Sequence, residues 1–169
     1  MPKPLFKSQA AHMFKILKGT VTEDSRSDDP ILLFKNMNLK DKRVLLVEDN
    51  DMNADIAKEI LGMTGIQIEW AEDGEKAVDM VQEKPDNYYD IILMDIQMPK
   101  MNGYEATRAI RALNNNYVRR IPIIAMTANA FVEDVQAAKG AGMNEHIAKP
   151  LDLRVFARIM EKYLLVNRQ

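Results

Sequence analysis

The sequence predicts an α/β protein built on one parallel sheet with helices on both faces. Five short apolar runs, each bounded by turn-forming residues, are typical of buried strands. Amphipathic stretches with a helical period separate these runs. Five such units in 169 residues favour an open, doubly wound sheet over a closed eight-stranded barrel. We therefore expect a five-stranded parallel sheet of order 2-1-3-4-5 with five helices.

The apolar runs place the strands, and the stretches between them place the helices. We expect strands at 43–48, 66–71, 90–95, 121–126 and 145–148, and helices at 52–63, 74–83, 104–113, 132–141 and 153–164. Asn50 and Asp51 suit the cap of the first helix, because short polar side chains accept hydrogen bonds from free backbone N–H groups. Gly65 and Gly142 suit helix exits, where a left-handed residue is common.

Composition limits the classes of function. The chain is 47% apolar and 28% charged, as is typical of a globular protein with a full core. Its net charge of -2 gives no general attraction to nucleic acid or to a membrane surface. Cysteine is absent, which excludes disulfides and thiolate metal sites and is compatible with the cytoplasm. With neither a transmembrane-length apolar stretch nor a signal-type N-terminus, we expect a cytoplasmic chain without direct membrane contact.

The first forty residues differ from the rest. Residues 22–29 are short-chained and acidic and end at Pro30, so we interpret 21–40 as a linker and 41–167 as the main domain. Lys3-Pro4-Leu5 repeats Lys149-Pro150-Leu151, and an apolar helical face follows it, made of Phe6, Ala10, Met13 and Leu17. We interpret residues 1–20 as the last helix of a truncated, preceding copy of the domain. An unrelated amphipathic segment is the alternative.

Polar residues end several of the predicted strands. Glu48 and Asp49 follow the first strand and Asp95 ends the third, so a 2-1-3-4-5 sheet brings the three carboxylates into one crevice. Two such charges about 4 Å apart repel each other by roughly 4 kcal/mol at an effective dielectric constant near 20. A hard divalent cation is the natural compensation. Carboxylates, a backbone carbonyl and water suit Mg²⁺, whereas the absence of Cys and of paired His argues against zinc.

Two further strand ends add a cation and a hydroxyl group to the same crevice. Lys149 follows the fifth strand, and Thr127 follows the fourth. Carboxylates, metal, ammonium and hydroxyl together suit a phosphoryl group, whose charge must be neutralised on several sides. An aspartate is a suitable nucleophile, because carboxylates form acyl phosphates. Asp95 is the best candidate.

Four motifs carry a resemblance to a known family. They are Leu46-Val47-Glu48-Asp49-Asn50, the run from Leu93 to Gly103, Ala125-Met126-Thr127-Ala128-Asn129-Ala130 and Ala148-Lys149-Pro150-Leu151. From about Lys42 to about Leu165, the chain resembles the receiver domain of two-component response regulators, which has a flavodoxin-like fold. The resemblance implies that Asp95 is the phosphoacceptor and that Glu48 and Asp49 are the acidic pair. Gln97 would lend its backbone carbonyl to Mg²⁺, with Mn²⁺ as a substitute.

The same resemblance implies a conformational switch. Thr127 and Lys149 would contact the phosphoryl oxygens, the Lys149-Pro150 peptide bond would be cis, and Thr127 would move inward followed by an aromatic side chain. Many members of the family carry Tyr or Phe three residues before the lysine, but this chain carries His146. Histidine is familiar there in receivers fused to sensor kinases. The motifs thus resemble most closely the C-terminal receiver of a hybrid sensor histidine kinase.

The phosphoryl donor must be another domain. Neither histidine is followed by an acidic residue in a suitable helix, and no Gly-rich ATP lid is present. A histidine kinase or a histidine phosphotransfer bundle is the expected partner. We expect docking at Met52, Asn53 and Ile56 on the first helix, although Met52 and Ile56 also suit a core. Because the sequence stops just past the last helix, we expect no DNA-binding output domain. A homodimer is possible, and nothing in the sequence decides it.

Three other functions compete with this interpretation. A phosphatase of the haloacid dehalogenase type needs a second Asp two residues after the nucleophile, where this chain has Gln97. A flavin carrier needs a first loop that attracts phosphate, whereas Glu48, Asp49 and Asp51 repel it. A degenerate receiver, used only for docking or dimerisation, would lack part of the acid, Thr and Lys set. Because the whole set is present, the sequence favours a functional phosphoacceptor.

Overall fold

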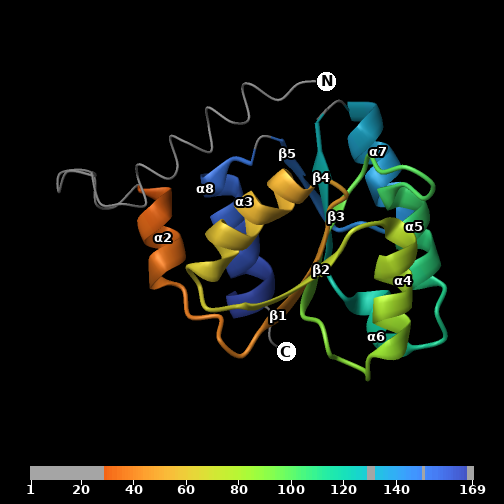
Figure 1. Cartoon of the computed structure of the whole chain (residues 1–169), viewed down its shortest axis with the longest axis horizontal. Helices are drawn as coiled ribbons and strands as arrows, with labels where there is room; N and C mark the ends of the chain where they lie inside the picture. The colour runs from red at the N-terminus through yellow and green to blue at the C-terminus, as the bar shows by residue number, and fades with distance from the viewer. Residues whose placement is uncertain (1–28, 129–131, 150, 167–169) are drawn as a thin grey trace.

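The computed structural model describes residues 29–128, 132–149 and 151–166 (Figure 1). Along the chain the elements are α2 (Pro30–Asn36), β1 (Arg43–Val47), α3 (Asp51–Gly62), β2 (Gln67–Ala71), α4 (Gly74–Glu83), β3 (Ile91–Asp95), α5 (Gly103–Arg111), α6 (Asn116–Arg120), β4 (Ile123–Thr127), α7 (Val132–Ala141), β5 (Glu145–Ala148), α8 (Leu153–Met160) and the π-helical turn η2 (Glu161–Val166). Strands and helices alternate through the main domain, as predicted.

The five strands form one parallel sheet in the order β2-β1-β3-β4-β5. This confirms the predicted fold and strand order. Helices α2, α3 and α8 lie on one face of the sheet, and α4, α5, α6 and α7 lie on the other (Figure 1). Strands β3 and β4 are buried along their whole length, which explains why their sequences are continuous apolar runs rather than alternating ones.

Alternate side chains of the central strands enter two separate apolar layers. Leu46 and Leu93 face α3 and α8, whereas Leu45 and Ile92 face α4, α5 and α7. The register pairs Val47 with Met94 across the β1–β3 ladder, so the carboxyl ends of these two strands lie side by side. The functional residues predicted from strand ends therefore meet at one edge of the sheet.

Local capping fixes where the helices that follow this edge begin. The Asn50 side chain accepts a hydrogen bond from the N–H of Asn53 at the start of α3. Asn102 and Glu105 form a reciprocal capping box at the start of α5. Gly65 and Gly142 have φ values of +80° and +105°, the left-handed conformation predicted for them.

The structure corrects the number of helices. The described residues contain seven α-helices rather than five, because α2 lies inside the predicted linker and the short α6 lies between α5 and β4. Helix α8 also ends at Met160 and continues as the π-helical turn. The remaining predicted helices and the five strands differ from the observed elements by a few residues at their ends.

The second half of the predicted linker is part of the core. Pro30 begins α2, whose N-cap Asp29 accepts a hydrogen bond from the N–H of Ile31 at 2.9 Å. Phe34 is fully buried and packs edge-on against Phe156 of α8, with 5.5 Å between ring centroids. The linker prediction is therefore wrong for 30–39. Residues 1–28 lie outside the described part, so the proposal of a truncated preceding domain stays a prediction.

Helix length and hydropathy bear on the expectation about membranes. Over the described ranges, none of the helices combines the length and the apolar character that crossing a bilayer requires.

Helix α2 gives the first prediction. We expect Phe34→Ala to lower the free energy of unfolding by about 3 kcal/mol, because it leaves a cavity against α8. Leu33 is the matched control: it is the neighbouring residue of the same helix but is 41% exposed. Leu33→Ala should change stability by less than about 0.5 kcal/mol. Urea unfolding followed by circular dichroism measures both, and equal losses would show that α2 is not part of the core.

Candidate functional site

Four charged side chains meet at the carboxyl edge of the sheet. Glu48 and Asp49 follow β1, Asp95 ends β3, and Lys149 follows β5. The Lys149 Nζ donates hydrogen bonds to Glu48 Oε2 at 2.8 Å and to Asp95 Oδ1 at 3.0 Å. The side chains of Glu48 and Asp95 are 3% and 5% exposed. The structure thus brings together residues that lie up to 101 positions apart, as the strand order predicts.

Thr127 lies beside this cluster. It ends β4, is buried, and its carbonyl oxygen accepts a hydrogen bond from the Lys149 N–H at 2.7 Å. This backbone contact fixes the end of β5, from which the Lys149 side chain extends to the carboxylates. The predicted cis peptide bond involves Pro150, which lies outside the described residues.

Backbone and side-chain donors hold Glu48 in place. Its Oε1 accepts a hydrogen bond from the Asn50 N–H at 3.2 Å and lies 3.5 Å from Asn53 Nδ2. Its carbonyl oxygen accepts a hydrogen bond from the Trp70 indole at 2.8 Å. Sequence reasoning assigned no site role to Trp70. Its position near the end of β2, the strand that pairs with β1, is the signal that identifies it.

The three carboxylates can surround a metal ion. Glu48, Asp49 and Asp95 each offer an oxygen, and the three oxygens lie within 4.8 Å of one another. Asp49 is exposed, whereas the other two are buried, so one side of the group is open to solvent. Oxygen ligands without nitrogen or sulfur fit a hard cation such as Mg²⁺. Gln97, the predicted carbonyl ligand, is exposed two residues after Asp95.

Burial and charge set the protonation of the cluster. Burial raises the pKa of Asp95 to about 7, the charge of Lys149 opposes this rise, and the nearby Glu48 adds to it. Burial alone would lower the pKa of Lys149, but the carboxylates of Asp95 and Glu48 raise it above its usual value of 10.5. Lys149 therefore stays charged. A further cation close to Asp95 would favour its ionised form.

The loop between β3 and α5 packs closely against the backbone of Asp95. A Cβ atom at Gly103 would lie 2.4 Å from the Asp95 carbonyl oxygen and 2.9 Å from Ile96 Cα. The Gly103 N–H donates to the Ile96 carbonyl at 2.9 Å. Only glycine permits this approach of α5 to the site strand. The Asn102-Gly103 pair that ends the second motif was the available signal.

The remaining predicted residues lie around the cluster. Thr127 and Gln97 line a hollow of about 420 Å³, together with Tyr104 and Asp134. His146 is half-buried on the edge strand β5, opposite Ala125. Among the described residues it makes no hydrogen bond or ion pair with the site carboxylates, so its switch role stays a prediction.

The docking residues differ in exposure. Met52 is 39% exposed at the start of α3, Asn53 is half-buried beside Glu48, and Ile56 is only 7% exposed. Met52 is thus available to a partner, whereas Ile56 belongs mainly to the core.

The family model of the response regulator receiver domain matches residues 44–161, so this chain belongs to that family. One relative is the "Probable histidine kinase 2" of Oryza sativa subsp. indica, 39% identical over 152 residues. Another is the "Hybrid signal transduction histidine kinase I" of Dictyostelium discoideum, 38% identical over 133 residues. These matches cover 83% and 75% of this chain but only 14% and 8% of the relatives' lengths.

Solved structures agree with this assignment. The receiver domain of the sensor histidine kinase PA1611 from Pseudomonas aeruginosa, with a magnesium ion in its active site cleft, has a TM-score of 0.65 and 39% identity. It covers 73% of this chain and 97% of that one. The Saccharomyces cerevisiae complex of the phosphotransfer protein Ypd1 with the Ssk1 receiver domain gives 0.66 and 27% identity, covering 75% and 93%.

The raised pKa of Asp95 gives a prediction about stability. The native pKa near 7 exceeds the ordinary 3.8, so the native state binds the proton more tightly than the unfolded chain. Ionisation of Asp95 therefore lowers native stability as the pH rises from about 4 to about 7. Without divalent metal, Asp95→Asn should be more stable than the parent by up to about 4 kcal/mol at pH 8, and by less as the pH approaches 4.

Urea unfolding in EDTA at several pH values measures this difference. Glu83→Gln serves as the control, because Glu83 is an exposed carboxylate at the end of α4 and its loss should leave the pH profile unchanged. An Asp95→Asn protein that is less stable than the parent at pH 8 would contradict the argument.

The carboxylate group gives a prediction about metal binding. Asp49→Ala should weaken Mg²⁺ binding by at least about tenfold, because an exposed ligand charge is lost. Lys149→Ala should largely spare binding, since the lysine supplies no metal ligand. Isothermal titration calorimetry compares the two variants with the parent. If both bind Mg²⁺ like the parent, the metal does not bind among these carboxylates.

Proposed function

We propose that this chain is a phosphoacceptor receiver in two-component phosphorelay signalling, with Asp95 taking the phosphoryl group. One observation carries the proposal: the buried carboxylate of Asp95 lies 3.0 Å from the Lys149 ammonium, within a group of three carboxylates. Membership of the receiver family supports it. The Asp, Thr and Lys set is complete, which argues against a degenerate module used only for docking.

The proposed reaction transfers a phosphoryl group from a phosphohistidine of the donor to the carboxylate of Asp95. An Asp95 carboxylate oxygen attacks phosphorus, a P–O bond forms, and the P–N bond to the donor's histidine breaks. The products are an acyl phosphate on Asp95 and a free imidazole, which keeps the electron pair of the broken bond. Bound Mg²⁺ would supply positive charge against the phosphoryl oxygens.

The residues of this chain prepare Asp95 for that step. Lys149 already donates to Asp95 Oδ1, so its charge lies where negative charge gathers during transfer. Thr127 ends β4, the strand next to β3, and its hydroxyl would donate to a phosphoryl oxygen after the side chain turns inward. Burial of Glu48 and Asp95 keeps water from weakening these interactions. The raised pKa of Asp95 makes its ionised form dependent on added positive charge.

The metal that the site suits best is Mg²⁺. The three oxygen donors of Glu48, Asp49 and Asp95 support this choice, as does the magnesium ion of the PA1611 receiver. The backbone carbonyl of Gln97 would add a neutral ligand. Mn²⁺ takes the same oxygen ligands and should substitute for Mg²⁺.

The partner is a phosphohistidine domain of a histidine kinase or of a phosphotransfer protein. The Ypd1–Ssk1 complex supports this choice, because it pairs a phosphotransfer protein with a receiver similar to this chain. The similarity to histidine kinases supports an origin in a hybrid kinase, of which this chain would be a cytoplasmic part. Docking would use Met52 and Asn53, with Ile56 beneath them, because these residues border the acidic crevice on α3.

Phosphorylation tests the proposed function directly. Incubation with acetyl phosphate and Mg²⁺ should add one phosphate, seen by intact-mass spectrometry, and EDTA should prevent the addition. Asp95→Asn should abolish it, because an amide is not a nucleophile for this transfer. Asp90→Asn is the control. The Asp90 carboxylate accepts a hydrogen bond from the Arg43 N–H at the amino end of β1, which is the opposite edge of the sheet from the site. An unchanged yield in Asp95→Asn would refute the assignment.

Met52 tests the docking part of the proposal. Met52→Glu should slow transfer from a phosphorylated protein donor by about tenfold, because it places a charge in an apolar contact. Labelling by acetyl phosphate should stay unchanged. Leu33→Glu is the matched control, since Leu33 is equally exposed but lies on α2. Equal slowing with both donors would mean damage to the site rather than to docking.

A further inference from the structure

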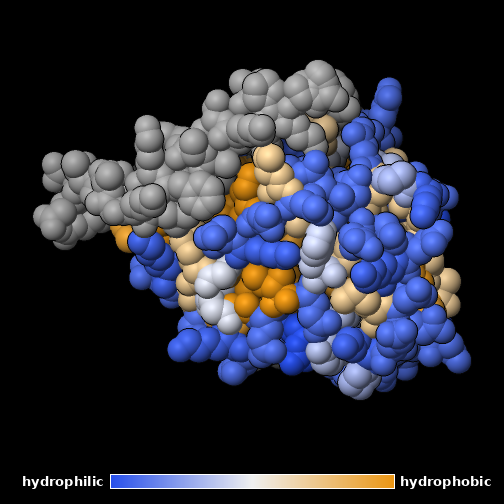
Figure 2. Space-filling view, in the orientation of Figure 1, coloured by the Kyte–Doolittle hydropathy of each residue, from blue (hydrophilic) through white to orange (hydrophobic). Residues whose placement is uncertain are grey.

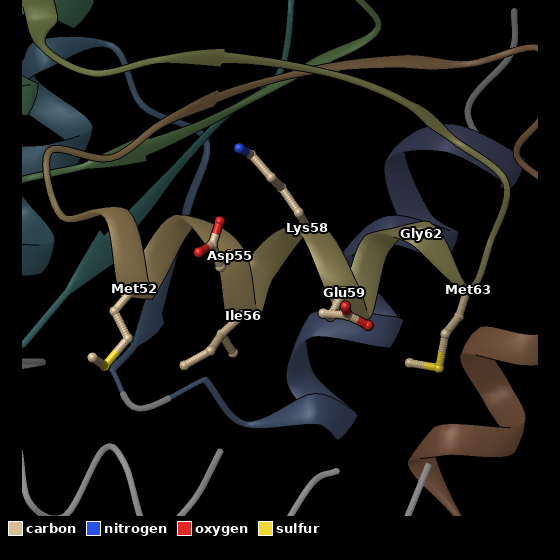
Figure 3. A pocket seen from close by; sticks show the side chains of 7 residues that line it. All are labelled: Met52, Asp55, Ile56, Lys58, Glu59, Gly62 and Met63. Carbon is tan, nitrogen blue, oxygen red and sulfur yellow. The ribbon is translucent and has the colours of Figure 1, made fainter. Parts of the chain in front are cut away.

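Helix α3 carries a hollow of about 840 Å³ on its outer face (Figure 3). The described residues that line it all come from α3 or its C-cap: Met52, Asp55, Ile56, Lys58, Glu59, Gly62 and Met63. Figure 3 shows Met52, Ile56 and Met63 pointing to the same side of the helix, and Figure 2 shows hydrophobic surface in this region bordered by hydrophilic side chains. These three residues form an apolar strip on this side of α3, in which Met52 is exposed, Met63 is half-buried and Ile56 is mostly buried.

An acidic stripe runs beside the apolar strip. Asp51, Asp55 and Glu59 are spaced by four residues, so they lie along one line on the helix, and all three are exposed. Within the described residues, none of the three forms an ion pair within 4.0 Å. Lys58, which also lines the hollow, points to the other side of α3 from Met52 and Ile56, and its ammonium group lies over the Trp70 ring at 4.2 Å (Figure 3).

The chain contains one segment with the complementary pattern. Residues 3–19 have an apolar helical face, made of Phe6, Ala10, Met13 and Leu17, and a line of lysines beside it, made of Lys7, Lys15 and Lys18. No acidic residue occurs before Glu23. We propose that residues 3–19 dock as an amphipathic helix in the α3 hollow of the same chain. Their apolar face would cover Met52, Ile56 and Met63, and their lysines would face the acidic stripe.

Chain length permits this docking. Residues 20–28 connect the segment to Asp29, the N-cap of α2, and nine extended residues span at most about 30 Å. Helix α2 lies close to the Met63 end of α3, as Figure 3 shows beside the labelled Met63. Helix α3 has 12 residues and is thus about 18 Å long, so the linker reaches either end of the hollow.

Gly62 is consistent with a helix seated here. It lies in the last turn of α3, where glycine costs about 1 kcal/mol relative to alanine. A Cβ atom at Gly62 would meet no described atom within 4 Å. The described domain thus gives no steric reason for glycine at this position. The absence of a side chain on this side of α3 allows another backbone to approach closely.

Cross-linking tests the proposal, because the chain has no cysteine of its own. Ala11→Cys lies in the lysine line of the segment, and Asp55→Cys lies at the middle of the acidic stripe. The full chain carrying both changes should react with a short bismaleimide to give an internally linked monomer. Pairing Ala11→Cys with Glu83→Cys is the matched control, since Glu83 is an exposed acid on the opposite face of the sheet. The α3 pair should link at least about tenfold faster than this control.

Charge reversal completes the test. Changing Lys7, Lys15 and Lys18 to Glu should slow the α3 cross-link by about tenfold, because attraction to the remaining acids Asp51 and Glu59 becomes repulsion. Changing Asp51 and Glu59 to Lys in the same protein should restore it. Equal rates for the α3 pair and the Glu83 pair would overturn the proposal. A product linked mainly between two chains would also overturn it, in favour of docking between copies. Neither readout depends on phosphorylation, so the result is independent of the proposed function.

Discussion

The attraction between Lys149 and two buried carboxylates governs the site. A parallel sheet with this strand order forces Glu48 and Asp95 to end at the same edge, where little water reaches them. Without a cation between them, their repulsion would oppose the alignment of β1 with β3. The ammonium group bonds to both at 2.8 and 3.0 Å, and its reach depends on β5 lying next to β4. The strand order brings the charged groups together, and the ion pairs of Lys149 in turn stabilise that strand order.

This balance leaves the site short of positive charge. One lysine faces three carboxylates, and burial, with a further contribution from the charge of Glu48, raises the pKa of Asp95 in spite of that lysine. A protein selected only for stability would replace such a cluster with apolar side chains, which often stabilise a core more than buried ions do. Retaining the cluster makes sense where a cation and a phosphoryl group must be bound. The cost of ionising Asp95 in this cluster is relieved when a cation binds, and the bound cation can then attract the phosphoryl oxygens.

The residue pattern predicted the sheet and the crevice because both depend on local signals. Apolar runs such as 91–94 identify strands, and the polar residue after each run identifies the edge at which chemistry gathers. Helix α2 was not predicted, because Pro30 looked like the end of an acidic linker, whereas proline also favours the first turn of a helix. Its stability depends on a distant contact between Phe34 and Phe156, which no local pattern shows. The contacts of Trp70 with Glu48 and of Gly103 with Asp95 likewise form only in the folded chain, so no local pattern shows them.

Helix α3 contributes both to the carboxylate site and to the outer surface that we propose as a docking face. Its first turn holds Glu48 through Asn50 and Asn53, its inner face fills the core, and its outer face carries the apolar strip and the acidic stripe. A protein donor that reaches Asp95 along Met52 would meet the same surface that we assign to residues 3–19. The two occupants would then exclude each other, so the affinity of the segment for α3 would reduce the fraction of chains open to a donor. Attached through a short linker, even a weakly binding helix acts at high local concentration, and a modest change in its charge would shift that fraction substantially.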